Sequence, residues 1–178
     1  MKFSSAEAIR AALHHALADV PLAGECALLD YPAYPNIGDH MIWLGEISYL
    51  TRVRGVKIRI TGSLEEPASL PGGLPILLSG GGNLGDLWAK HQAFRERIVS
   101  RYRDRPIVIF PQTLYFRDPA NLRKAAAVFN SHPDLTILVR DERSLEVAQA
   151  FGNCRVRLAP DMAFELAGSL GFTRMPAQ

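Results

Sequence analysis

The 178 residues have a mass of 19.6 kDa, which is enough for one domain with a buried core. Hydrophobic residues make up 48% and charged residues 21% of the chain, as in ordinary globular proteins. A formal net charge of +2 does not supply the concentrated basic face that binds nucleic acid. No window approaches the run of about 18 apolar residues that a membrane span requires, and the N-terminus has no signal-peptide pattern. We therefore expect a cytoplasmic protein without a nucleic-acid partner.

Helical and extended patterns alternate along the chain. Apolar residues at helical spacing, together with caps and breakers, predict helices near 4–17, 39–54, 86–102, 119–130, 142–151 and 162–170. Short apolar runs between them predict strands at 25–31, 56–60, 75–79, 106–110, 135–139 and 155–158. The strand at 56–60 alternates apolar and basic residues, as a half-exposed or edge strand does. The glycines and prolines of 61–74 predict a surface loop.

This alternation predicts an α/β fold with a doubly wound, mostly parallel, Rossmann-like sheet and helices on both faces. We expect residues 1–170 to form one domain, and 171–178 to be a frayed tail or the start of a linker. Cys26 and Cys154 lie in or beside apolar runs, with no His or Cys at ligand spacing. Two buried thiols are therefore favoured over a disulfide, and no metal site is expected.

In open parallel sheets, ligands bind where the strands end and the next helices begin. Distinctive residues follow five of the expected strands, at 36–39, 80–86, 111–112, 140–141 and 160–161. Good turn chemistry would produce similar residues, so their position alone marks a candidate site and does not prove one.

The segment Gly80–Gly85 matches the pattern G-x-G-x-x-G and follows a strand. A dinucleotide site also needs an acidic residue at the tip of the next strand, where this chain has Pro111-Gln112-Thr113. NAD binding is therefore disfavoured. The glycines still allow backbone N–H groups to approach an anion or a sugar closely. The alternative is a tight turn in which Asn83 or Asp86 caps the following helix.

Three charged residues stand out at these strand ends. Asp39 and Asp86 are each expected at a helix N-terminus, where capping explains them, although two carboxylates could also hold or deprotonate a sugar hydroxyl. Arg140 ends an apolar strand, and its guanidinium suits a phosphate or a carboxylate. The structural alternative for Arg140 is an ion pair with Asp141 or Glu142.

Taken in order, five segments resemble the polysaccharide pyruvyltransferase family. They are Tyr34–Asp39, Ser79–Asp86, Ile109–Thr113, Val139–Ser144 and Ala159–Asp161. Each segment is common by itself, but five in this order over nearly the whole chain are much more specific. The resemblance implies an enzyme of exopolysaccharide or capsule biosynthesis that transfers pyruvate from phosphoenolpyruvate to a pair of sugar hydroxyls as a ketal. It also implies one half of a glycosyltransferase-B-like (GT-B-like) architecture, with the site between two Rossmann-like domains.

On this resemblance, Asp39 and Asp86 are the candidate catalytic residues, with Asp39 the better base. The candidate substrate-binding residues are Asn36, Gly38, Gly80, Gly81, Gly82, Asn83, Gln112 and Arg140. No cofactor is implied beyond phosphoenolpyruvate as donor substrate. The partner would be a saccharide or a lipid-linked oligosaccharide, which would bring the protein to the membrane periphery, and homo-oligomerisation stays open.

One departure from the family concerns length. Family members are much longer, and their second domain carries the His and Arg that look responsible for acid catalysis and donor binding. This sequence is therefore expected to be the N-terminal, acceptor-side domain, either truncated or naturally short, and activity of the isolated chain stays open. Two alternatives remain: a sugar-nucleotide glycosyltransferase domain, and a non-catalytic module that binds a saccharide or a partner.

Overall fold

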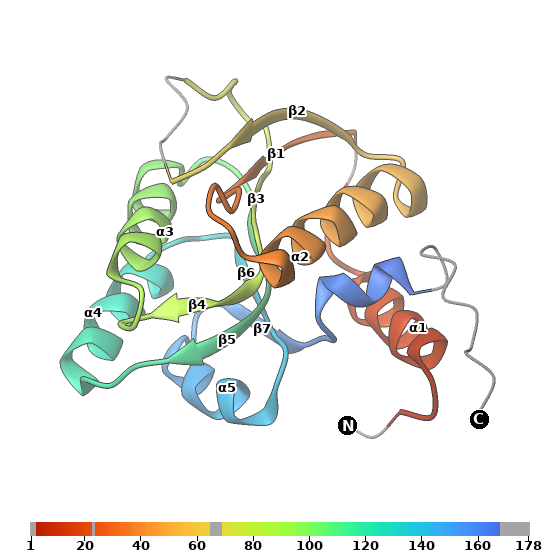
Figure 1. Ribbon diagram of the computed structural model, residues 1–178. Helices are drawn as coiled ribbons and strands as arrows, with labels where there is room; N and C mark the ends of the chain where they lie inside the picture. The colour runs from red at the N-terminus through yellow and green to blue at the C-terminus, as the bar shows by residue number, and fades with distance from the viewer. Residues whose placement is uncertain (1–2, 23, 65–68, 168–178) are drawn as a thin grey trace.

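The computed structural model describes residues 3–22, 24–64 and 69–167. Its strands form one seven-stranded sheet in which each recorded pairing is parallel (Figure 1). The strands are β1 (Glu25–Leu29), β2 (Lys57–Gly62), β3 (Ile76–Leu78), β4 (Gly81–Gly85), β5 (Ile107–Tyr115), β6 (Leu135–Val139) and β7 (Arg155–Leu158). The order across the sheet is β2-β1-β3-β5-β6-β7, and β4 pairs with β5 beyond the end of β3.

Helices cover both faces of this sheet. One face carries α3 (Ala89–Arg101), α4 (Pro119–Asn130) and α5 (Glu142–Val147), which the 3-10 turn η2 (Ala148–Ala150) extends. The other face carries α1 (Ala6–Leu17), α2 (Ile37–Ser48) and the 3-10 helix η3 (Met162–Leu166). The π-helical turn η1 (Tyr49–Val53) continues α2. The α/β fold with a parallel sheet and two helical layers is therefore confirmed.

Alternation along the strands explains why two helical layers form. In β1, Ala27 and Leu29 belong to the core beneath α3 and α4, whereas Cys26 and Leu28 belong to the core beneath α1 and α2. All four are buried, as is typical of parallel strands covered on both faces. Each fully buried leucine contributes roughly 1.5–3 kcal/mol of burial free energy, so loss of either helical layer would strongly destabilise the fold. By contrast, the edge strand β2 alternates exposed and half-buried residues, as predicted.

The strand order reverses between β1 and β3, because β2 lies outside β1 and the remaining strands lie beyond β3. At such a switch point the loops after the two strands leave in opposite directions and open a crevice. The loop after β1 leads to α2 on one face, and the chain after β3 leads through β4 to α3 on the other. The fold thereby places residues 30–39 and 79–91 on either side of one opening.

Two segments that we predicted as loops are strands. The glycine segment forms β4, in which Gly81 pairs with Gln112 and Gly85 with Tyr115. Residues 111–113 accordingly lie inside β5 and are not its exit loop. Pro111 lacks an N–H group and sits where the pairing with β6 shifts register, so the strand continues past it. A Cβ on Gly85 would lie 1.8 Å from the carbonyl oxygen of Tyr115, so this pairing requires glycine there.

Three further predictions differ in detail. The helix after the glycine segment begins at Ala89, so Asp86 does not cap it. The last helix spans Met162–Leu166 in the described chain, and the rest of its predicted range, like the tail 171–178, lies outside the described residues. Cys26 is buried and Cys154 is half-buried, and both are free thiols. No helix in the described part of the chain is both long and apolar enough to cross a membrane.

Candidate functional site

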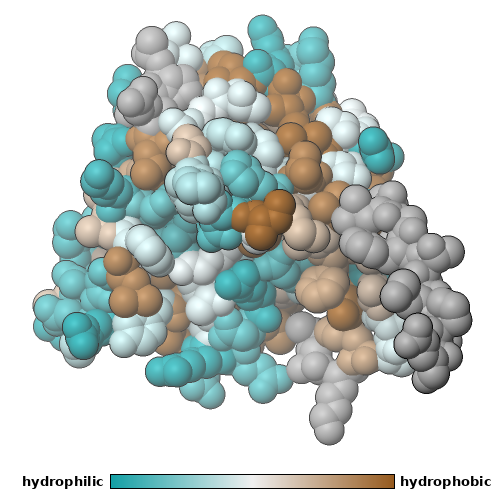
Figure 2. Space-filling model, viewed as in Figure 1, coloured by the Kyte–Doolittle hydropathy of each residue, from teal (hydrophilic) through white to brown (hydrophobic). Residues whose placement is uncertain are grey.

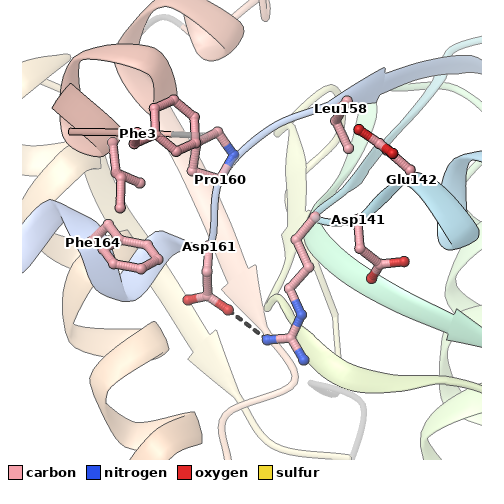
Figure 3. A pocket seen from close by; sticks show the side chains of 9 residues that line it. Phe3, Asp141, Glu142, Leu158, Pro160, Asp161 and Phe164 are labelled. Carbon is pink, nitrogen blue, oxygen red and sulfur yellow. Dashed lines mark hydrogen bonds and ion pairs between the residues drawn. The ribbon is translucent and has the colours of Figure 1, made fainter. Parts of the chain in front are cut away.

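A cavity of about 600 Å³ opens at the carboxyl edge of the sheet, at the switch point. Its walls come from the loop after β1, the first turn of α2, strand β4 and the start of α3, and Arg140 after β6 closes one side. A second cavity of about 450 Å³ and a third of about 440 Å³ share Arg140 with it. Figure 3 shows the second cavity, where Phe3 and Phe164 face the carboxylates of Asp141 and Glu142. On the face drawn in Figure 2, apolar patches alternate with polar surface.

Asp39 lies on the first turn of α2, where the helix dipole favours a negative charge. Asn36 caps this helix by accepting the N–H of Gly38 at 3.0 Å, and its amide nitrogen donates to Asp39 Oδ2 at 2.9 Å. The Tyr34 hydroxyl donates to the same oxygen at 2.8 Å. Burial, together with the hydrogen bond to Asp39, raises the pKa of Tyr34, so its hydroxyl stays a neutral donor.

The second oxygen of Asp39 is directed to the glycine segment. A Cβ on Gly81 would lie 3.4 Å from Asp39 Oδ1, and the φ of Gly81 is +127°. Glycine at this position therefore allows both the backbone conformation and the close approach of the two walls. Asp39 has one oxygen fixed by two donors and one facing β4, an arrangement that suits a carboxylate that accepts a proton from a bound hydroxyl.

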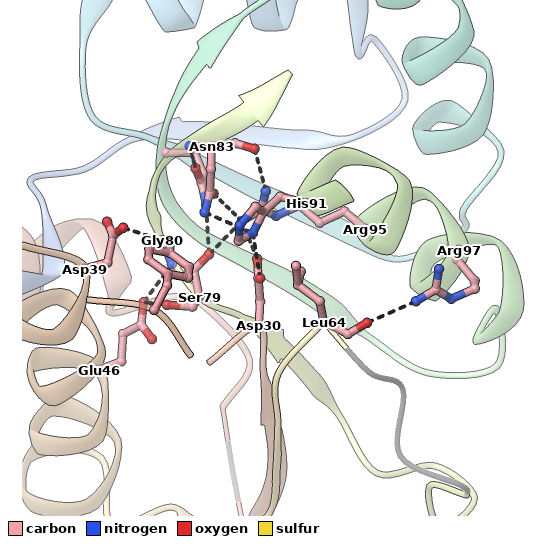
Figure 4. A network of polar contacts seen from close by, with 12 residues as sticks. Asp30, Asp39, Glu46, Leu64, Ser79, Gly80, Asn83, His91, Arg95 and Arg97 are labelled. Atoms are coloured by element: carbon pink, nitrogen blue, oxygen red, sulfur yellow. Dashed lines mark hydrogen bonds and ion pairs between the residues drawn. The ribbon is translucent and has the colours of Figure 1, made fainter. Parts of the chain in front are cut away.

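Beneath the glycine segment, the fully buried side chains of Glu46, Arg95 and Gln112 converge on the link between β3 and β4. Figure 4 shows Glu46 and Arg95 on either side of this link. Glu46 Oε1 accepts the N–H of Gly80 at 2.7 Å and the hydroxyl of Ser79 at 3.1 Å. The carbonyl of Ser79 accepts from Gln112 Nε2 at 2.7 Å and from Arg95 Nη2 at 3.3 Å. Gln112, predicted to bind substrate, is thus a buried support for the cavity wall, and the N–H of Gly80 is already used inside the protein.

Asp30 and Arg95 form the most deeply buried ion pair in the site. Arg95 Nη2 lies 2.5 Å from Asp30 Oδ2, and their side chains are 0% and 1% exposed. The same guanidinium donates to the carbonyl and the side-chain oxygen of Asn83, at 2.9 and 2.6 Å. Asp30 also has a φ of +71°, a region that non-glycine residues rarely adopt. The pair therefore orients Asn83 in the cavity wall.

His91 also lines the cavity, although it was not among the site residues predicted from the sequence. Its Nδ1 lies 3.0 Å from Asp30 Oδ1 and 3.1 Å from Asn83 Nδ2, and its ring packs edge-on against Tyr34. A signal was present in the sequence, because His91 and Arg95 are one helical turn apart. Both therefore point to the same side of α3, the side that carries its buried residues.

Arg140 is held from two sides. Its Nε donates to Thr113 Oγ1 at 2.8 Å, and its Nη1 pairs with Asp161 Oδ2 at 2.5 Å; Figure 3 shows Asp161 reaching the guanidinium. The sequence-based alternative named Asp141 or Glu142 as the partner of Arg140, whereas the ion pair in the structure is with Asp161. The carboxylate of Asp141 instead caps α5, accepting the N–H of Ser144 at 2.7 Å.

The structure therefore brings together most of the predicted site residues. Those that line the central cavity or the third cavity are Asn36, Gly38, Asp39, Gly82, Asn83 and Arg140.

Asp86 lies apart, beside a cavity of about 170 Å³ lined mainly by α3 and α4. Its carboxylate accepts the N–H groups of Arg117 and Asp118 and so fastens β4 to the loop before α4. Within the described ranges, no group of three or more His, Cys, Asp or Glu side chains is placed to hold a metal ion.

Comparisons with known proteins point to the same family as the five sequence segments do. The family model described as polysaccharide pyruvyl transferase matches residues 36–173. EpsO of Bacillus subtilis, named as a pyruvyl transferase, is 38% identical over 154 residues, which cover 83% of this chain and 47% of EpsO. Pyruvyl transferase 1 of Schizosaccharomyces pombe is 31% identical over 150 residues, 78% of this chain and 37% of that protein. The chain thus spans half or less of the length of these relatives.

A solved structure supports the fold alone. The crystal structure of an uncharacterised protein from Klebsiella pneumoniae superposes with a TM-score of 0.60 at 19% identity. The match covers 85% of this chain and 56% of that one.

Proposed function

Because the chain belongs to the polysaccharide pyruvyl transferase family, we propose that it forms the acceptor-side half of an enzyme that moves pyruvate from phosphoenolpyruvate onto a sugar. One observation carries this proposal. A single cavity combines a carboxylate on a helix N-terminus, two asparagine amides and an arginine, contributed by Asp39, Asn36, Asn83 and Arg140. Amides and a carboxylate suit sugar hydroxyls, whereas a guanidinium suits the carboxylate or phosphate of the donor.

The proposed reaction forms a ketal at C2 of the pyruvyl group. Protonation of the enol carbon C3 gives an oxocarbenium-like centre at C2, which one sugar hydroxyl attacks. A second hydroxyl then attacks C2, and the C–O bond to phosphate breaks. Of the two hydroxyl protons, one balances the proton taken up at C3 and the other leaves with phosphate, so no redox partner is needed.

Asp39 is the proposed general base for the attacking hydroxyl. Its Oδ2 is fixed by Tyr34 and Asn36, while its other oxygen faces the cavity wall at Gly81. Asn36 and Asn83 would orient the hydroxyl pair, and Arg140 would bind the anionic donor. Asp86 is not assigned a step, because its carboxylate is engaged by backbone N–H groups outside the cavity.

This half would work together with a second domain and with a saccharide acceptor. A GT-B-like partner domain would close the cleft and supply the acid that protonates C3. The acceptor would be a saccharide or a lipid-linked oligosaccharide in exopolysaccharide or capsule synthesis, in the cytoplasm at the membrane periphery. The family membership of the chain supports these parts of the proposal.

Product analysis tests the function directly. The full-length enzyme, which carries this half together with its partner domain, is incubated with phosphoenolpyruvate and a panel of saccharides bearing neighbouring hydroxyl pairs, and inorganic phosphate and acceptor mass are measured. We expect phosphate release that depends on the acceptor, with the acceptor gaining the mass of a pyruvate ketal. Acceptor-dependent release of a nucleoside diphosphate from sugar nucleotides would instead identify a glycosyltransferase. Saccharide binding without any turnover in the complete gene product would identify a binding module.

A further inference from the structure

Two of the three guanidinium nitrogens of Arg140 are fixed by the protein. Nε donates to the Thr113 hydroxyl at 2.8 Å, and that hydroxyl donates to Asp141 Oδ2 at 3.0 Å. The Thr113 proton is thus directed away from Arg140, which leaves a lone pair for Nε. Nη1 pairs with Asp161, whose other oxygen caps η3 by accepting the N–H of Ala163 at 2.8 Å. Both supports are themselves held, so the guanidinium plane has one preferred direction.

The third nitrogen, Nη2, is directed towards Gly82. A Cβ on Gly82 would lie 3.1 Å from Arg140 Nη2, and the described chain provides no recorded acceptor for this nitrogen. Gly82 is exposed in β4 and has no left-handed φ, so its backbone would accept a side chain. The reason for glycine at this position is therefore the space in front of Arg140 and not the backbone conformation.

The inference rests on the proposed function, in which Arg140 contacts an anionic donor. We propose that Thr113 and Asp161 aim Arg140 so that Nη2 alone faces the cavity, and that the missing side chain at Gly82 is the opening through which the donor's anionic group reaches it. Thr113 and Asp161 are positioning residues in this arrangement, and Gly82 sets which groups can approach.

Asp161 also limits the charge that this subsite accepts. Its side chain is 16% exposed and that of Arg140 is 29% exposed, so the two charges largely cancel next to the opening. A carboxylate or phosphate bound at Nη2 is attracted by Arg140 and repelled by Asp161. Replacing Asp161 by Asn removes this repulsion, but the single amide oxygen that caps η3 leaves an NH2 group facing Nη1, so the variant also loses the ion pair that aims Arg140.

Arginine side-chain NMR of the isotopically labelled protein separates these roles. The Nε–H signal of Arg140, assigned by its loss in Arg140→Lys, should exchange with solvent slowly in the wild type. Thr113→Val should accelerate that exchange at least about tenfold, because the variant removes the only recorded acceptor of Nε among the described residues. Gly152→Ala serves as a control, because a Cβ there meets nothing within 4 Å.

Titration with phosphoenolpyruvate and with inorganic phosphate then tests the opening. The wild type should show a saturable shift of the Arg140 signals, and Gly82→Val should weaken binding at least about tenfold. If exchange in Thr113→Val equals that of the wild type, or if Gly82→Val binds as the wild type does, the inference is wrong while the proposed function stands. If neither ligand shifts Arg140 in the wild type, the anion subsite is overturned, and donor binding by this half fails with it.

Discussion

The carboxylate of Glu46 on α2 accepts the backbone N–H of Gly80 at 2.7 Å, across the interior between a helix and the start of the cavity wall. Glu46 is completely buried, and its second oxygen, Oε2, has no hydrogen-bond partner among the described residues. A buried carboxyl with one oxygen unpaired is more stable as the neutral acid. Glu46 therefore holds the turn between β3 and β4 without adding a charge beneath the site.

The neutral form of Glu46 predicts a pH dependence of stability. Burial, reinforced by the nearby Asp161 and Asp30, raises the pKa of Glu46 from 4.5 to about 8, despite hydrogen bonds from Gly80 and Ser79 that oppose the shift. Between these values the folded protein holds one proton more than the unfolded chain, so this contribution is complete below about pH 4.5 and is lost as the pH rises towards 8. Urea unfolding should show that the stability of wild type relative to Glu46→Gln falls as pH rises from 5 to 8, at about 1 kcal/mol per pH unit or less.

Glu7→Gln is the matched control for this measurement. Glu7 is exposed, and its pKa is lowered by hydrogen bonds from its own backbone and Ser5. The difference between wild type and Glu7→Gln should therefore not fall over the same pH range. A constant difference between wild type and Glu46→Gln would show that Glu46 is ionised in the folded protein.

Removing one member of the Asp30–Arg95 pair should destabilise the protein strongly. Asp30→Asn keeps a residue that tolerates the φ of +71°, but leaves the fully buried Arg95 without its counter-charge. We expect a loss of roughly 3–5 kcal/mol in urea unfolding. Glu25→Gln, which removes the partner of the half-exposed Arg59, should cost under about 1 kcal/mol. Equal losses in the two variants would contradict a supporting role for the buried pair.

Asp39→Asn tests the proposed general base. The amide keeps the shape of the side chain but cannot take a proton, so turnover in the assay described above should fall by about 100-fold or more. The free energy of unfolding should change by about 1 kcal/mol or less, mainly through the lost interaction with the helix dipole. Asp19→Asn, at an exposed carboxylate outside the cavity, is the control and should leave turnover unchanged. Full turnover in Asp39→Asn would remove this residue from the chemistry.

Asp86→Asn should separate a structural role from a catalytic one. Hydrogen bonds from the N–H groups of Arg117 and Asp118 lower the pKa of Asp86, as expected for a carboxylate that fastens a loop. We expect faster amide hydrogen exchange at Arg117 and Asp118, with turnover and ligand affinity kept. A loss of turnover with unchanged amide exchange would return Asp86 to the list of catalytic residues.

The sheet and its two helical layers were predictable because continuous apolar strands and amphipathic helices depend on local patterns. The segment from Gly80 to Gly85 was not, because glycines and a nearby proline usually indicate turns. In the structure, pairing between Gly81 and Gln112 satisfies the backbone of both segments and extends the sheet. Strand pairing is a long-range interaction, and the local composition at either segment carries no record of it.

The site was predictable where a residue follows a strand end, as Asn36, Asp39 and Arg140 do. Glu46 and Arg95 were missed, because each lies in a helix whose pattern indicates core and each is buried by contacts distant in the chain. Asp30 was missed because the predicted strand 25–31 included it, whereas β1 ends at Leu29. Asp86 shows the opposite case. Its position next to glycines suggests a site, but its partners are backbone groups about thirty residues later.

Mapping of backbone and side-chain NMR shifts tests the central claim most directly, because it requires no turnover by this half alone. The labelled protein is titrated with phosphoenolpyruvate and, separately, with a saccharide that carries a neighbouring hydroxyl pair. The account predicts that the saccharide shifts signals of Asn36, Asp39 and Asn83, and that phosphoenolpyruvate shifts those of Gly82 and Arg140. Shifts confined to the cavity beside Asp86, or none with either ligand, would contradict the assignment of the cleft as the pyruvyl transfer site.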